Sequence, residues 1–104
     1  MDSSVKIKIK SIVQSILPGA KIILFGSRAR GDNNNDSDYD FLLITKKQFS
    51  LREKLICRGK INLLLVYALH SPVDVLLNSE QEINIKKTLP GHIVRWAIKE
   101  GVEL

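Results

Sequence analysis

The sequence has few of the features that would indicate a secreted, membrane-bound or disulfide-stabilised protein. It contains one cysteine, Cys57, among 104 residues, which excludes an internal disulfide and favours a reducing, cytoplasmic location. The longest apolar run, Leu63 to Leu69, is too short to cross a membrane. The N-terminal segment from Val5 to Lys10 alternates apolar residues with lysines and lacks the continuous apolar core of a signal peptide.

Aromatic residues are also scarce, at 6% of the chain, and they are not interleaved with basic residues as in proteins that bind single-stranded nucleic acid. The net charge of +5 allows an anionic partner, but the basic residues are spread along the chain, so a nucleic-acid partner is possible without being favoured. A hydrophobic content of 44% is ordinary for a globular protein. The length predicts a single domain over residues 1–104, without room for a second, substrate-binding domain.

Apolar spacing and turn residues predict an α/β fold. We expect a helix over residues 4–17, strands over 21–25, 39–45 and 73–77, a helical turn over 27–30, and helices over 49–69, 79–88 and 92–99. The long helix carries an apolar side that we assign to the core: Leu51, Leu55, Ile56, Leu63, Val66 and Tyr67. Trp96, on the last helix, is likewise expected in the core.

The most informative feature is a glycine–serine pair followed, after ten residues, by two aspartates. Gly26 and Ser27 follow a predicted strand, where a turn lets backbone N–H groups approach a phosphate and a helix start adds its positive end. Asp38 and Asp40 stand two residues apart at the head of the next strand, so both carboxylates project from one face. This combination indicates metal-dependent phosphoryl or nucleotidyl transfer.

A third carboxylate, Asp74, lies in the middle of an apolar strand, where an unpaired charge is costly. If this strand lies beside the one that carries Asp38 and Asp40, three carboxylates converge and require divalent cations, for which Mg²⁺ is the natural choice. The alternative is a structural ion pair between Asp74 and Arg28, Arg30 or a lysine.

The segments Gly26 to Gly31 and Ser37 to Asp40, together with Val73-Asp74-Val75, resemble the minimal nucleotidyltransferases of the DNA polymerase beta-like superfamily. The resemblance covers nearly the whole chain, including the closing segment Ile98 to Val102. It implies a nucleotidyltransferase fold, in which helices flank a small mixed β-sheet, and transfer of AMP from ATP–Mg²⁺ with release of pyrophosphate.

The resemblance also assigns the site residues. Gly26 and Ser27 would hold the β- and γ-phosphates, Asp38 and Asp40 would bind both metals, and Asp74 would complete one metal site and activate the acceptor. Arg28 and Arg30 would contact phosphate, with the alternative that one of them caps the fold through a carboxylate.

Stand-alone members of the family are often antitoxins paired with a helical HEPN-type ribonuclease toxin, which they block by transferring AMP to a toxin tyrosine. The resemblance and the short chain therefore imply a HEPN-type protein as acceptor and a hetero-oligomeric complex. Two alternatives stay open: an antitoxin that neutralises by binding alone, and an adenylyltransferase that acts on RNA or a small molecule.

Overall fold

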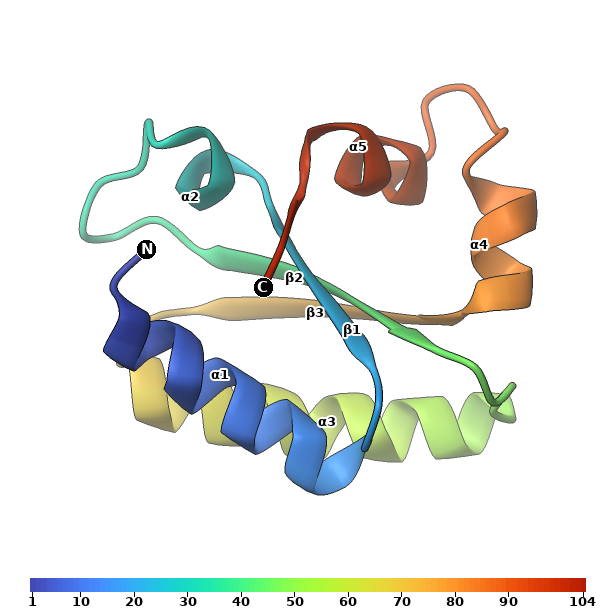
Figure 1. Ribbon diagram of the computed structural model, residues 1–104, viewed down its shortest axis with the longest axis horizontal. Helices are drawn as coiled ribbons and strands as arrows, with labels where there is room; N and C mark the ends of the chain where they lie inside the picture. Colours follow the sequence, from blue (N-terminus) through green and yellow to red (C-terminus); the bar gives the residue numbers. More distant parts are fainter.

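The computed structural model describes residues 1–104 and folds them into a four-stranded sheet between two layers of helices (Figure 1). This confirms the predicted α/β class and the mixed sheet flanked by helices. The elements are, in chain order, α1 (Ser3–Ile16), β1 (Lys21–Phe25), α2 (Ser27–Arg30), β2 (Tyr39–Thr45), α3 (Leu51–Leu69), β3 (Val73–Ser79), α4 (Glu80–Lys86), α5 (Ile93–Glu100) and β4 (Val102–Glu103).

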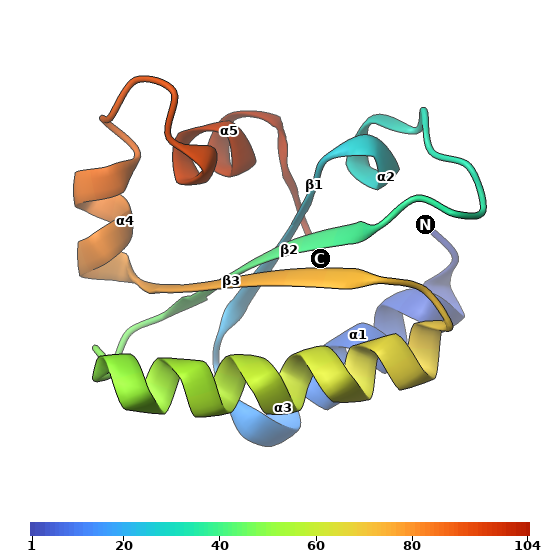
Figure 2. The ribbon, with the colours of Figure 1, turned by 180° about the vertical axis from the view of Figure 1, so that it is seen from behind.

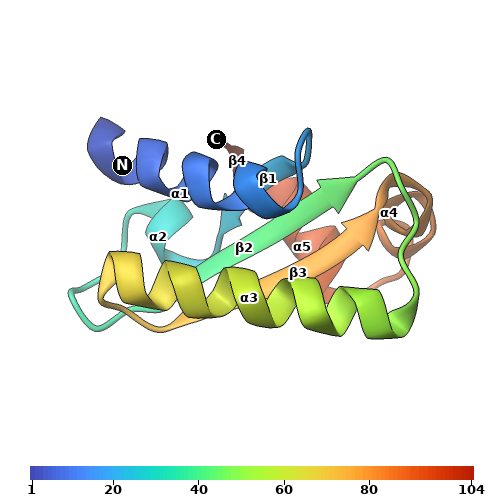
Figure 3. The same cartoon turned by 90° about the horizontal axis from the view of Figure 1, so that it is seen from below.

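The strands lie in the order β3-β2-β1-β4. Strand β1 is antiparallel to both of its neighbours, β2 and β4, whereas β2 and β3 are parallel. A parallel pair needs a long crossover, and α3 provides it. Strand β3 therefore forms one edge of the sheet, with α3 running along it (Figure 3).

Each face of the sheet has its own apolar core. Helices α1 and α3 cover one face, and α4 and α5 cover the other (Figure 2). The first core contains 13 buried residues, among them Ile9, Phe41 and Leu65. The second contains seven, among them Leu42, Val94 and Ala97. Because β1 and β2 are covered on both faces, they read as continuous apolar runs instead of alternating patterns.

Side-chain caps mark the first residue of four of the five helices. The strands over 21–25 and 39–45 and the helical turn over 27–30 lie where they were predicted. Helix α3 begins two residues later than predicted because Ser50 forms a capping box with Glu53. Strand β3 continues to Ser79, which then caps α4 together with Glu82. Strand β4 has two residues and was not predicted.

The core-facing side of α3 was predicted wrongly. The helix buries Ile61 and Leu65, and of the residues assigned to the core only Val66 is partly buried against it. The other five are exposed: Leu51, Leu55, Ile56, Leu63 and Tyr67. Helix α3 carries apolar residues on nearly all sides, so their spacing does not single out one face.

The prediction for Trp96 was also wrong. Helix α5 turns Val94 and Ala97 toward the sheet, and the Trp96 side chain remains 54% exposed. None of the helices combines the length and apolar character that a membrane span requires.

Two glycines should respond oppositely to alanine. A Cβ at Gly101 would overlap the Ile23 side chain and the Ala97 carbonyl, whereas nothing lies within 4 Å of a Cβ at Gly59. We expect Gly101→Ala to lower the free energy of unfolding by about 1–3 kcal/mol through overpacking. Gly59→Ala should raise it by about 0.5–1 kcal/mol, since alanine favours the helix. Urea denaturation measures both, and equal effects would contradict the packing described for Gly101.

Candidate active site

The sheet places Asp40 next to the two other parts of the predicted motif. In the antiparallel pair Asp40 lies opposite Phe25, the residue before Gly26, and in the parallel pair it lies in register with Asp74. Residues in register project to the same face of a sheet. Asp38 lies immediately before β2. The strand pairing therefore brings the glycine–serine turn, Asp40 and Asp74 to the same end of the sheet.

Tyr39 separates Asp38 from Asp40 and points to the other face of the sheet. It packs against the core under α1 and α3 and stacks on Phe41, with ring centroids 5.9 Å apart. Asp40 and Asp74 consequently share the face that carries α5.

Gly26 is required by the geometry of the turn. Its φ of 77° and ψ of −158° lie in a region that essentially only glycine occupies. A Cβ at this position would also overlap the Asp40 carboxylate. Helix α2 starts at Ser27, and no side chain caps its first N–H groups. The turn thus presents backbone donors directly beside a carboxylate.

Asp74 is exposed. The sequence analysis expected a free-energy cost for an unpaired charge in this apolar strand, and exposure to solvent removes that cost. Its neighbours Val73 and Val75 are buried because they face the core on the opposite side of β3. On its own side the described contacts of α4 and α5 begin farther along the strands, at Leu42 and Leu76. Asp74 forms no salt bridge with Arg28, Arg30 or a lysine. Its carboxylate is open to a ligand.

The neighbouring aspartates Asp74 and Asp38 make the charge on Asp40 less favourable. Partial burial raises the pKa of Asp40, and the charges of Asp74 and then Asp38 raise it further, while the Arg30 charge acts in the opposite direction. Asp40 therefore carries its negative charge less readily than an isolated aspartate does. A bound cation would remove this penalty.

The donor set suits Mg²⁺ bound jointly with a substrate. No three histidine, cysteine or acidic side chains converge tightly enough to form a metal site from protein groups alone. Mg²⁺ characteristically uses one or two carboxylates together with water and substrate phosphates instead of an all-protein cage. Asp40 and its neighbours offer such carboxylates beside the Gly26 turn, where a phosphate would complete the coordination.

Both arginines of the motif contact the protein itself. The Arg28 Nε donates to the Ser37 carbonyl at 3.0 Å, and its guanidinium lies 3.9 Å from the centre of the Tyr39 ring. Arg30 pairs with Asp32 at 3.2 Å and with Glu100 at 3.4 Å. The sequence analysis offered the alternative that one arginine contacts a carboxylate of the fold instead of phosphate. This alternative applies to Arg30, whose side chain stays half exposed. Phosphate binding by either arginine remains a prediction.

A hollow of about 410 Å³ beside the Gly26 turn was not predicted. Helix α5 contributes Ile93, Trp96 and Glu100 to it, and Arg30 lines the side toward α2. The spacing of these three residues on α5, three and then four apart, places them on one helix face and is the signal that could have revealed the hollow.

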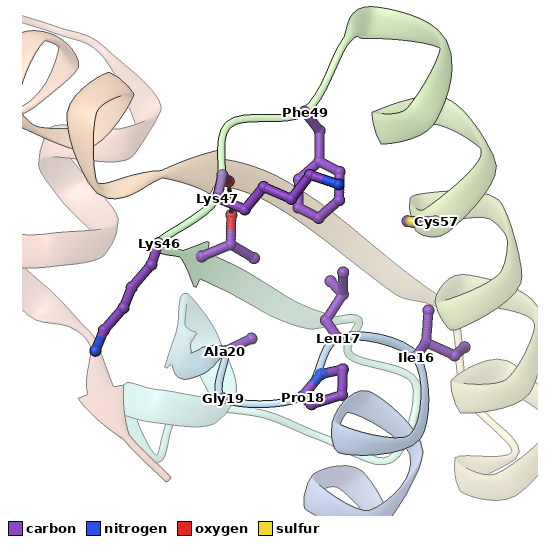
Figure 4. A pocket seen from close by; sticks show the side chains of 10 residues that line it. Ile16, Leu17, Pro18, Gly19, Ala20, Lys46, Lys47, Phe49 and Cys57 are labelled. Carbon is purple, nitrogen blue, oxygen red and sulfur yellow. Dashed lines mark hydrogen bonds between the residues drawn. The ribbon is translucent and has the colours of Figure 1, made fainter.

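Another cavity, of about 510 Å³, lies at the opposite end of the sheet (Figure 4). It is formed where β1 begins and β2 ends, and Leu17, Phe49 and Cys57 line it together with Lys46 and Lys47. No carboxylate lines it, so it is separate from the aspartate cluster.

We expect Asp40→Asn to stabilise the metal-free protein. The folded state raises the pKa of Asp40 above its unfolded value, so the ionised form destabilises the fold at neutral pH, and this effect fades as the pH falls through the raised pKa. The variant should melt at a higher temperature than the wild type at pH 7, with the difference shrinking in acid. Asp36→Asn, in the exposed loop, is the control; a lower melting temperature for Asp40→Asn would contradict the repulsion.

The chain is similar in sequence to known proteins. Residues 6–102 match the family described as "Nucleotidyltransferase domain". The chain is 34% identical over 84 residues to "Putative protein adenylyltransferase MJ0141" of Methanocaldococcus jannaschii, covering 81% of this chain and 77% of that protein.

Two solved structures show the same fold. A "toxin-antitoxin with AMP-PNP" matches with a TM-score of 0.71 and 21% identity, over 94% of this chain and 70% of the other. The "tri-AMPylated Shewanella oneidensis HEPN toxin in complex with MNT antitoxin" matches with a TM-score of 0.62 and 19% identity, over 99% and 71%. With its motif, its fold and its matched residues in agreement, the chain belongs to the nucleotidyltransferase domain family.

Proposed function

We propose that this nucleotidyltransferase transfers AMP from ATP, with Mg²⁺, to a tyrosine hydroxyl of a HEPN-type toxin and acts as its antitoxin. The observation that carries the proposal is the alignment of Asp40 with Asp74 on an open face directly beside the Gly26 turn. This arrangement provides a place for phosphates, a place for cations and an exposed carboxylate for the acceptor.

The turn and the first two aspartates bind the nucleotide. The uncapped N–H groups at the start of α2, together with the Ser27 hydroxyl, hold the β- and γ-phosphates. Asp38 and Asp40 would hold both cations, and Asp74 would complete one of the two metal sites. Mg²⁺, when bound, neutralises the charge that develops on the phosphate oxygens. Arg30 reaches phosphate by exchanging its exposed contact with Asp32 for the nucleotide.

Asp74 activates the hydroxyl of the acceptor. It accepts the proton of the attacking hydroxyl, whose oxygen forms a new bond to the α-phosphorus. The bond between the α-phosphorus and the bridging oxygen breaks, and pyrophosphate leaves from the side of the Gly26 turn. Asp74 is exposed on the neighbouring strand, so a hydroxyl carried by another protein can reach it.

The named relatives support the choice of reaction and acceptor. One is named as an adenylyltransferase of proteins, one contains an ATP analogue, and one is a complex between an MNT antitoxin and an AMPylated HEPN toxin. The single cysteine is consistent with action in the cytoplasm, where ATP and Mg²⁺ are plentiful.

Transfer can be measured with ATP labelled on the α-phosphate, Mg²⁺ and the protein encoded by the neighbouring gene as the candidate acceptor. We expect label on a tyrosine of that protein and none after chelation of the metal. Asp74→Asn should slow transfer by about 10²–10⁴-fold, the usual contribution of a general base. The double change Asp38→Asn with Asp40→Asn should reduce it to background.

Asp36→Asn should transfer at the wild-type rate, since Asp36 is exposed in the loop before the motif. Equal labelling by the wild type and the double variant would refute the proposed chemistry. Neutralisation of the toxin in cells by the double variant would instead favour an antitoxin that acts by binding alone.

Metal and nucleotide should bind together. Because no ready-made metal site is present, Mg²⁺ alone should change the melting temperature little, and AMP-PNP alone should also have a small effect. Both together should stabilise the fold by about 2.7 kcal/mol at a hundredfold excess over the dissociation constant. Differential scanning fluorimetry compares the three conditions. Full stabilisation by Mg²⁺ alone would contradict joint coordination.

A further inference from the structure

Helix α3 carries an apolar row that the fold does not use. Leu55, Gly59, Leu63 and Tyr67 recur every four residues and therefore line one side of the helix. The Leu55, Leu63 and Tyr67 side chains are 57%, 71% and 83% exposed. The helix already buries Ile61 and Leu65 against the sheet, so its packing in this chain is complete without the row.

The row is continuous with the carboxylate of the active site. A hollow of about 270 Å³ is lined by Leu55, Arg58, Gly59 and Asn62 of α3 and by Asp74 and Val75 of β3. Gly59 forms a notch in its wall, because no atom lies within 4 Å of the place where a Cβ would stand. A group seated at this notch borders the strand that carries Asp74.

The adjacent strand edge is open. Strand β3 pairs only with β2, and Asn62 donates a hydrogen bond to the Val73 carbonyl. Backbone groups of alternate residues point to the same side of a strand, so those of Val75 face the same edge without a strand partner. No further strand pairs with β3 on the side that α3 borders (Figure 3), so no strand blocks an approach to β3 from that side.

If the proposed reaction is correct, its geometry requires the acceptor to approach from the side of β3 and α3. This part of the inference rests on the proposed function. An in-line displacement places the attacking and leaving oxygens on opposite sides of the phosphorus. Pyrophosphate is held at Gly26, at the end of β1, while Asp74 lies on β3, beyond β2. The acceptor must then arrive across β3, where the notch and the row lie.

We propose that the row on α3 is the docking surface for the acceptor protein. Its occupant is an α-helix of the partner, apolar along one face and flanked by acidic residues. A row at four-residue spacing interrupted by a glycine suits close packing of a second helix. The docked helix buries the leucines and brings the partner's hydroxyl across Gly59 to Asp74.

Charge argues against a second copy of this chain as occupant. Three cations on α3, Arg52, Arg58 and Lys60, form no salt bridge within the protein. Two copies packed through the row would bring these cations toward one another, which acidic residues on a partner would instead neutralise. Exposed leucines likewise fit burial against a protein better than contact with a nucleic-acid backbone, which is polar and anionic.

The test measures binding and transfer separately, with the protein encoded by the neighbouring gene as the probe. Leu63→Glu places a charge in the row, and Gly59→Leu fills the notch with a good helix former at an open position. Both should weaken binding of the probe at least about tenfold in isothermal titration calorimetry. Binding of Mg²⁺ with AMP-PNP should be unchanged. The matched control is Ile85→Glu, which alters an equally apolar, 62% exposed residue on α4.

The outcomes separate this inference from the proposed function. If both row variants lose binding while Ile85→Glu keeps it, the docking surface stands, even if no AMP is transferred. If the row variants bind and transfer like the wild type, the docking surface is wrong and the chemistry stands. Two results would overturn the choice of occupant. One is that the wild-type protein does not bind the probe. The other is that the wild-type protein forms dimers and Leu63→Glu makes it monomeric.

Discussion

The parallel pairing of β2 with β3 is the constraint on which the rest of the molecule depends. It brings Asp40 and Asp74 into register, and the antiparallel pairing of β1 with β2 brings the Gly26 turn to the same end. A slip of one residue in either pair would turn a carboxylate to the opposite face, into the apolar core. Because α3 must connect the parallel strands, the same pairing also places that helix along the edge of the sheet beside Asp74.

The fold stabilises an arrangement that is unfavourable in itself. Three aspartates gather beside a glycine turn in a backbone conformation that other residues avoid. The compensation lies elsewhere, in apolar cores on both faces of the sheet and in capped helices. The ion pair between Lys54 of α3 and Glu82 of α4 links the two helical layers near the end of β3. Burial acts to raise the pKa of Glu82, but hydrogen bonds from Lys54 and the Ser79 backbone, with the nearby lysine charges, lower it overall.

The parts of the fold that could be predicted are those with a local signal. Two strands and the turn at 27–30 agree with the prediction because apolar runs and glycines delimit them. The core-facing side of α3 could not be predicted, since Leu63 and Leu65 are equally apolar and tertiary packing alone selects Leu65. The exposure of Asp74 depends on how far α4 and α5 extend over the sheet, and the exposure of Trp96 depends on which face of α5 packs against it. The two residues of β4 carry no pattern; they form a strand because β1 offers them an edge.

The position of Asp74 has a consequence for the solubility of the protein. Open strand edges invite pairing with the edge of another molecule, and proteins avoid this with charges placed within the edge strand. Strand β3 otherwise consists of valine, leucine and two small polar residues, and Asp74 is its one charged residue. The carboxylate to which we assign the acceptor's proton thus also discourages two sheets from joining edge to edge. Substitutions at this position act on aggregation as well as on chemistry.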